Sequence, residues 1–437
     1  MNFHHSHSNI TCFYITTIAM LVVGCQSPHL MPTPNLYVME GIDVFSEVPT
    51  ALQTCSMNVI YATDRLSNDC DNELHPYGSK RSTSLAVGMA TIEIGSDLDW
   101  ATLAEQSTVA DRSSKLSLAL TNVQEKIRMP ETPLPHIEET GQVWDSPEAA
   151  EALQMAVRDL HQLLGDYLEH TDNKEAFVYI HGYNNTFDDA VYVIAQLWHF
   201  LGRRGVPIAY TWPAGRGGLR GYNYDRESGE FTIYHLKQFL QSLASSPDVR
   251  KIHLIAHSRG TDVMITALRE LHIYYQGKGT STREALKLGN IILAAPDIDL
   301  EVVTQRAYAE RLQFVPERMT VYISEYDRAI GLAEWLFDSI VRIGQLTIEL
   351  LTDTQKKHLA SLPHLNLIDA NVKSGFIGHG YFYAHPAVSS DLILILRDDR
   401  DAGMEHGRPL RELAPNYWQI DSQYPISKQQ YEQIREE

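Results

Sequence analysis

Cysteine is scarce in this sequence of 437 residues. The four present are Cys12, Cys25, Cys55 and Cys70, and none of them forms the paired Cys-x-x-Cys spacing of a zinc site. A disulfide-rich scaffold and a structural zinc site are therefore excluded. For Cys55 and Cys70 two options stay open: a disulfide that closes a short loop in an oxidising compartment, or two unpaired thiols.

Basic residues are also few. Lys and Arg number 36 against 55 Asp and Glu, so the formal net charge at pH 7 is −19. A surface this acidic repels phosphate backbones, and we expect no nucleic-acid partner. The hydrophobic share of 44% and the charged share of 21% are those of an ordinary globular protein, which excludes a disordered or collagen-like chain.

The apolar run near the N-terminus is too short to span a membrane. It covers the 14 residues from Ile10 to Val23, enough for the apolar part of a signal peptide, whereas a transmembrane helix needs about 20. The run ends in Val22-Val23-Gly24-Cys25, which resembles the lipobox of bacterial lipoproteins. The resemblance implies that residues 1–24 are a signal peptide and that Cys25 carries a lipid anchor.

Gln26 follows this cysteine, and the lipoprotein resemblance then implies the outer membrane, with the protein facing the periplasm. We therefore expect a lipid-anchored protein of the bacterial cell envelope. The sequence departs from the usual pattern because residues 1–24 contain no Lys or Arg. An uncleaved apolar N-terminus is the alternative.

Cofactor motifs are missing as well. The sequence has neither a G-x-x-x-x-G-K-[ST] phosphate loop nor an H-E-x-x-H metal helix. After Gly215 and Gly217, the third glycine of the dinucleotide fingerprint is replaced by Arg220. We therefore expect no cofactor and no metal. Residues 213–231 are predicted to form a mobile cap, held by Tyr222 and Asp225.

From Ala176 onward, continuous apolar runs of five to seven residues alternate with helical patterns. This alternation predicts an α/β protein with a mainly parallel sheet covered by helices on both faces. The predicted strands are FVYIHG, VPIAYTW, IHLIAHS, NIILAAP, MTVYIS (319–324) and LNLIDA (365–370), and the predicted helices are 187–201, 230–243, 260–274, 332–343 and 388–396.

The regions on either side are less regular. Residues 25–50 are predicted to be a tether, residues 51–410 a single α/β domain with an N-terminal strand extension and residues 411–437 a polar tail. Within the domain, two strand-like runs at 57–63 and 85–94 predict an N-terminal extension of the sheet, and residues 148–170 predict an amphipathic helix. Residues 99–145 have no assignment.

The segment Ala256-His257-Ser258-Arg259-Gly260 follows an apolar strand and leads into a helix. It matches the G-x-S-x-G nucleophile elbow with alanine in place of the first glycine. Small residues are needed there because the serine stands on a tight, strained turn. We predict that Ser258 is a nucleophile. The alternative is a serine that caps the helix N-terminus.

A serine hydrolase also needs N–H donors for the oxyanion, and a base with an orienting acid that follow the serine in chain order. We predict that the oxyanion hole is formed by the N–H groups of Arg259 and of Tyr183, which follows the flexible Gly182. His379 is the predicted base and Asp327 the predicted acid, because both come after strands. The open alternatives are Asp297, Asp299 and Glu325 for the acid, His385 for the base, and a simple turn at His181-Gly182.

Several of these motifs together resemble a bacterial α/β-hydrolase family whose function is unknown. They are IHGYNNTFDDA, TWPA, the HSRG elbow, SEYDRAI and GHGYF, with VIYATDR and LAVGMATIEI before them. The resemblance runs from about Asn58 to Arg397. It implies the α/β-hydrolase fold and the triad Ser258, Asp327 and His379, but no substrate.

We therefore expect a serine esterase or lipase-like enzyme that cleaves a small-molecule or lipid ester through an acyl-enzyme on Ser258. It needs no cofactor, and its membrane contact is the lipid anchor at Cys25. The alternative function is a catalytically silent hydrolase-fold protein that serves as a binding or envelope-assembly module, because fold alone does not determine function.

Overall fold

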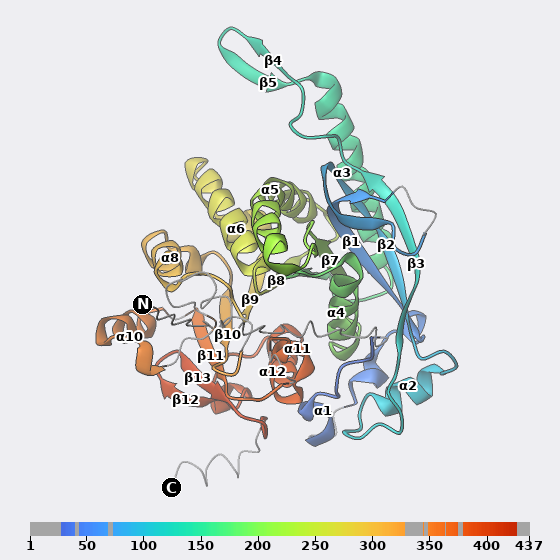
Figure 1. The fold of residues 1–437 in the computed structure, drawn as a ribbon, viewed down its shortest axis with the longest axis vertical. Helices are drawn as coiled ribbons and strands as arrows, with labels where there is room; N and C mark the ends of the chain where they lie inside the picture. The colour runs from blue at the N-terminus through green and yellow to red at the C-terminus, as the bar shows by residue number, and fades with distance from the viewer. Residues whose placement is uncertain are drawn as a thin grey trace, which may run out of the picture.

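The computed structural model describes residues 28–39, 43–68, 73–327, 344, 348–362, 364–374 and 379–425. The predicted signal peptide, Cys25, Cys70 and the predicted helix at 332–343 lie outside these ranges. The described residues form a large sheet of 11 strands in the middle of the molecule, with helices on both faces (Figure 1). No helix in these ranges is long and apolar enough to cross a membrane.

The strands of this sheet lie in the order β12-β13-β11-β10-β9-β8-β6-β7-β1-β2-β3. Neighbours from β1 through β7, β6, β8, β9, β10 and β11 to β13 pair in parallel, and antiparallel pairs occur only at the two ends, in β1-β2-β3 and β12-β13. The bounds are β1 (Ser56–Ser67), β2 (Tyr77–Ile94), β3 (Leu118–Arg128), β6 (Glu175–Ile180), β7 (Val206–Thr211), β8 (Lys251–His257), β9 (Leu288–Ala294), β10 (Arg318–Ile323), β11 (Leu365–Ala370), β12 (Arg411–Ala414) and β13 (Tyr417–Ile420). The predicted parallel sheet with extra N-terminal strands is confirmed.

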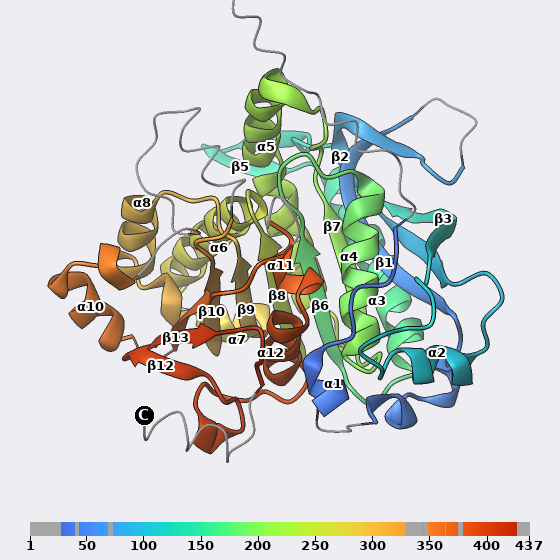
Figure 2. The same cartoon turned by 60° about the horizontal axis from the view of Figure 1, so that its bottom comes forward.

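The central strands are buried on both faces. Every residue of β7 and β9 is buried, which explains why their sequences are continuous apolar runs and do not alternate with polar residues. Helices α3 (Pro147–Leu168), α5 (Gly218–Ala244) and α6 (Gly260–Gly277) cover one face. Helices α4 (Phe187–Phe200) and α12 (Pro386–Leu396) cover the other, as the turned view of Figure 2 shows.

Shorter helices complete the layers. They are α1 (Asn35–Met39), α2 (Trp100–Gln106), α7 (Thr282–Leu286), α8 (Leu300–Thr304), the π-helix η3 (Gln305–Ala309), α10 (Asp353–Ala360) and α11 (Tyr381–Ala384). A separate hairpin of β4 (His136–Glu139) and β5 (Gln142–Asp145) projects beyond the end of α3 at the top of Figure 1. Residues 99–145, which had no assignment from the sequence, thus form α2, β3 and this hairpin.

Two predictions for the ends of the chain are wrong in the described ranges. The predicted tether is packed: Leu36, Tyr37 and Phe45 are buried in the core. The predicted polar tail adds β12 and β13 to the sheet, where Tyr417 and Ile420 are fully buried. Both segments contain only short apolar runs, such as Leu36 to Met39 and Tyr417-Trp418, and these are enough to pack against the body.

The segment predicted as a mobile cap, residues 213–231, is mostly helical. Helix α5 begins at Gly218, so most of the cap is the N-terminal half of a long helix. Asp225 on this helix is fully buried, and its carboxylate accepts hydrogen bonds from Asn184 N at 2.9 Å and Gly215 N at 3.2 Å. This agrees with the predicted role of Asp225 in holding the segment.

His199 on α4 joins the N-terminal region to the body. Arg203 donates to His199 Nδ1 over 3.2 Å, and the same guanidinium donates to Leu52 O and Thr54 O, each over 2.7 Å. Because a guanidinium cannot accept, Nδ1 must be unprotonated, and Nε2–H then donates to Ser107 Oγ over 2.8 Å. Burial and the Arg203 charge hold the pKa of His199 well below its usual range.

We expect this histidine to make folding stability depend on pH. In the folded protein His199 stays neutral, whereas in the unfolded chain it takes up a proton below about pH 6.5, so its contribution is lost as the pH falls. The loss reaches about 2 kcal/mol at pH 5. Urea unfolding of the wild type at pH 7.5 and pH 5 measures it. His199→Gln should reduce the difference between the two pH values, and the exposed His170→Gln should leave it unchanged. If all three proteins lose the same stability between pH 7.5 and pH 5, His199 is not the group responsible.

Candidate active site

Ser258 occupies the turn between β8, which ends at His257, and α6, which begins at Gly260. Its φ is 51°, in the left-handed region that costs a non-glycine residue about 1–3 kcal/mol. The Ser258 N–H donates over 2.9 Å to Ala294 O, at the end of the neighbouring β9. The surrounding structure therefore holds Ser258 in the strained backbone conformation of a nucleophile elbow.

Two glycines bring the loop after β6 against this turn. A Cβ on Gly260 would lie 2.3 Å from His181 O and 2.6 Å from Ile180 O. A Cβ on Gly182 would lie 2.7 Å from Ser258 Cβ. Atoms do not approach so closely, and a larger residue at either glycine would push the two turns apart.

His379 and Asp327 are in direct contact. His379 Nδ1 lies 2.7 Å from Asp327 Oδ2, and the Asp327 side chain is fully buried, whereas that of His379 is 22% exposed. A carboxylate only accepts, so Nδ1 carries the proton and donates it. Nε2 of the neutral ring is then left with a lone pair that can take up a proton.

The residue that precedes the serine brings this histidine close to the elbow. The rings of His257 and His379 have centroids 4.6 Å apart, and His257 Nε2–H donates to His379 O over 3.0 Å. Burial, together with the nearby His379, holds the pKa of His257 well below its usual range, so His257 stays neutral. Among the described residues, no hydrogen bond joins Ser258 Oγ to His379. Such bonds are often long or poorly aligned before substrate binds.

Two of the rival residues have other tasks. Asp299 caps helix α8 and accepts from Glu301 N and Val302 N, and His385 caps α12 through Ala387 N. Asp297 is buried close to the elbow, where its N–H lies 3.3 Å from Ser258 O. Within the described part of the chain, no three His, Cys, Asp or Glu side chains gather as metal ligands.

The predicted oxyanion donors lie on the two turns that meet here. Arg259 directly follows Ser258 at the N-terminus of α6, and its N–H has no acceptor among the described residues. Tyr183 follows Gly182, which contacts Ser258, and the Tyr183 ring packs against Tyr222 with centroids 5.5 Å apart. Each turn thus carries one predicted donor.

Arg65 on β1 holds the loops around this turn, and the sequence reasoning missed it. Its fully buried guanidinium donates to Asn185 O after β6 at 2.9 Å and to Ala214 O after β7 at 2.8 Å. It also donates to Thr211 Oγ1 at 3.2 Å and to Gly78 O at 2.9 Å. One side chain of the N-terminal strand thus joins the loops that follow β6 and β7. Its signal in the sequence was its place at the end of the motif VIYATDR, after the apolar run and Asp64.

His181 also joins the loops that follow β6 and β7. Its ring stacks on Trp212 with centroids 5.1 Å apart, and Arg65 Nη2 lies 3.3 Å from His181 Nε2. Burial and the Arg65 charge lower the pKa of His181 to about 3, so the ring is neutral at pH 7. The loop after β6 is therefore more than a simple strand-ending turn.

Residues 157–397 match the model of a family described as alpha/beta hydrolase of unknown function (DUF900). The chain belongs to this family. The match covers just over half of the sequence and includes the elbow and both residues of the Asp327–His379 contact. The strands β1 to β3, with Arg65, lie before the matched region.

Two solved structures of hydrolases are similar to parts of this member of the family. A predicted CIB-like hydrolase from Thermoplasma acidophilum is 15% identical with a TM-score of 0.32, and the alignment covers 52% of this chain and 88% of the other. Serine hydrolase CCSP0084 from the polyaromatic hydrocarbon-degrading bacterium Cycloclasticus zankles is 10% identical with a TM-score of 0.21, over 61% and 89% of the two chains. No curated protein matches this chain.

The close contact at Gly260 can be tested by substitution with alanine, and Gly277 on the same helix provides the control. We expect Gly260→Ala to lower the free energy of unfolding by about 1–3 kcal/mol, because the new Cβ collides with two backbone carbonyls. Gly277, at the other end of α6, has no atom within 4 Å of its virtual Cβ. Gly277→Ala should be neutral or raise stability by up to about 1 kcal/mol. Urea unfolding compares the two, and equal effects would contradict the close packing of the turns.

The Arg65 contacts predict that even the conservative change to lysine lowers stability and activity. Arg65→Lys keeps the charge but lacks the forked donors, so carbonyls of both loops lose their partners. We expect a loss of about 2–4 kcal/mol in stability. Any hydrolytic activity measured well below the unfolding temperature should fall at least tenfold, since the loops lose their position. The exposed Arg226→Lys serves as the control. Activity unchanged in Arg65→Lys would show that this side chain supports only the fold.

Proposed function

We propose that this protein is a serine hydrolase that cleaves a carboxylic ester through an acyl-enzyme on Ser258. The observation that carries the proposal is the 2.7 Å contact between His379 and the buried Asp327, in the neighbourhood of a serine with left-handed backbone. A buried carboxylate that orients a histidine beside a serine on a strained turn is the arrangement that nucleophilic catalysis needs. A serine that only caps a helix needs neither partner.

In the proposed first step, Ser258 Oγ attacks the ester carbonyl carbon while its proton moves to His379 Nε2. Asp327 keeps the proton of Nδ1 in place and stabilises the imidazolium that forms. The tetrahedral intermediate then collapses, the bond to the alcohol oxygen breaks, and His379 returns the proton to the departing alcohol. Ser258 is left with the acyl group as an ester.

In the second step, water attacks the acyl-enzyme. His379 takes a proton from the water, the oxygen adds to the carbonyl carbon, and a second tetrahedral intermediate forms. When the bond to Ser258 Oγ breaks, His379 returns the proton to the serine. The carboxylic acid leaves, and the enzyme is regenerated with no cofactor consumed.

Both intermediates carry a negative oxygen, which we assign to the N–H groups of Arg259 and Tyr183. The assignment is supported by the position of Arg259 at the start of α6 and of Gly182 against Ser258. Each such donor is worth about 3–4 kcal/mol in the transition state. The proposed function therefore depends on the close packing of the two turns as well as on the three side chains.

Kinetics with p-nitrophenyl esters test the roles of the residues. Asp327→Asn should lower kcat by about 10⁴-fold because the ring loses the correct tautomer, and Ser258→Ala should remove the activity. Asp299→Asn and His385→Asn are the matched controls, since asparagine can still cap a helix, and both should stay within about threefold of the wild type. An activity that survives Ser258→Ala would contradict the proposal. A purified wild type with no activity on any ester would favour the silent binding module.

A further inference from the structure

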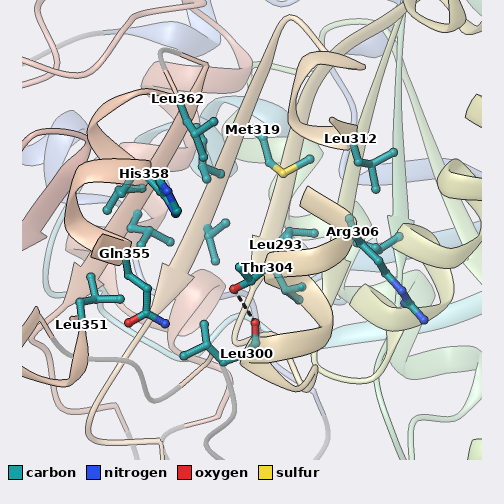
Figure 3. Close-up of a pocket in the computed structure, with 16 residues that line it drawn as sticks. Leu293, Leu300, Thr304, Arg306, Leu312, Met319, Leu351, Gln355, His358 and Leu362 are labelled. Atoms are coloured by element: carbon teal, nitrogen blue, oxygen red, sulfur yellow. Dashed lines mark hydrogen bonds between the residues drawn. The ribbon is translucent and has the colours of Figure 1, made fainter. Parts of the chain in front are cut away.

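An apolar pocket lies on the α6 face of the sheet, over strands β9 to β11 (Figure 3). Its floor is a row of three side chains in register, Leu293, Val321 and Leu367, with Met319 and Leu365 in the next row. Helices α8 and α10 and the π-helix η3 form its walls. Ser258, Asp327 and His379 do not line it.

Three of the polar side chains that border this pocket are hydrogen-bonded to other groups of the protein. Thr304 Oγ1 donates to Leu300 O over 2.8 Å, as the dashed line in Figure 3 shows. Arg306 donates to Asp262 and Thr266, each over 3.1 Å. Gln355 accepts from Thr352 in the capping box of α10. These hydrogen bonds can all be kept when an apolar ligand occupies the pocket.

Three connections place the pocket beside the nucleophile elbow. Leu293 is paired in register with Ala256, two residues before Ser258. Leu300 follows closely after Asp297, whose N–H lies 3.3 Å from Ser258 O. Arg306 and Arg259 both bind the carboxylate of Asp262, at 3.1 Å and 3.0 Å.

The direction of the strands gives the pocket an orientation. Leu293 lies near the carboxyl end of β9 and Leu300 follows that strand, so this end of the pocket is on the side of the elbow. Met319 and Leu365 lie at the amino ends of β10 and β11, so the other end points away from it. Two residues of strand separate the rows, which corresponds to about 7 Å.

The volume of the pocket is about 110 Å³. An apolar cavity of about 150 Å³ holds one benzene molecule, with six carbons, and stays dry when empty. By this comparison the pocket has room for a linear chain of about four to six carbons. A chain of that length also spans the distance between the two rows of floor residues.

We propose that this pocket binds the acyl chain of the substrate, so that the enzyme acts on esters of short linear fatty acids. The inference rests on the proposed function. The acyl group stays at Ser258 until the second step releases it, whereas the alcohol must take a proton from the partly exposed His379 and leave before water attacks. A pocket that is apolar and does not border His379 therefore suits the acyl chain and not the leaving group.

A series of p-nitrophenyl esters from acetyl to dodecanoyl tests this assignment. Each methylene that enters the pocket should raise kcat/KM about fourfold. The rise should end at about hexanoyl, where the pocket is full. A kcat/KM that does not change with acyl length, or that rises steadily to dodecanoyl, would overturn the assignment.

Variants of α8 provide the matched comparison. Leu300 borders the pocket, and Val302 on the same helix is 39% exposed and outside it. In Leu300→Trp the ratio of kcat/KM for the hexanoyl ester to that for the acetyl ester should fall at least tenfold, because the indole fills the space. In Val302→Trp the ratio should stay within twofold of the wild type. Equal ratios in the two variants would overturn the proposal.

A second variant covers the case in which the tryptophan disturbs folding. Leu351→Ala enlarges the pocket and should move the optimum to longer chains by two carbons or more, and an unchanged optimum would count against the pocket. Ser258→Ala distinguishes a failure of the proposed function from a failure of the acyl pocket. If ester hydrolysis does not depend on Ser258, the proposed function fails and the inference with it. If it depends on Ser258 but not on acyl length, only the acyl pocket is wrong.

Discussion

The close approach of two backbone turns organises this molecule. The turn after β8 carries Ser258 in a left-handed conformation, and the loop after β6 lies so near that only glycine fits at positions 182 and 260. The loop after β6 is held by Arg65 and by Asp225, two buried charged residues on separate elements that donate to and accept from its backbone. The strain at Ser258 is thus maintained by packing and hydrogen bonds around it.

The N-terminal strands take part in the site through this arrangement. Arg65 lies on β1, before the region that matches the hydrolase family, yet its guanidinium reaches the loops that follow β6 and β7. His257 has a comparable role on the other side, since its imidazole donates to the backbone of His379. We assign both as positioning residues, because they hold the backbone around the proposed catalytic groups. Replacing them should alter rate and stability together.

Much of the fold could be predicted because its central strands are buried on both faces and therefore appear as continuous apolar runs. The elbow could be predicted because the crowding of the turn leaves a trace in the small residues around Ser258. The packed ends of the chain could not: Leu36, Phe45 and Tyr417 lie in apolar stretches of only two to four residues, too short to predict packing, and their burial depends on distant partners. The role of Arg65 could not be predicted either, because most of its acceptors are main-chain carbonyls far along the chain. The lipid anchor at Cys25 stays a prediction.

The central claim is that Ser258 is a nucleophile activated by His379. Labelling with a fluorophosphonate, followed by mass spectrometry of the digested protein, tests it most directly. The account predicts one covalent adduct on the peptide that contains Ser258, and slower labelling by at least a hundredfold in His379→Ala. An adduct on any other residue, or labelling of Ser258 at the same rate without the histidine, would contradict it.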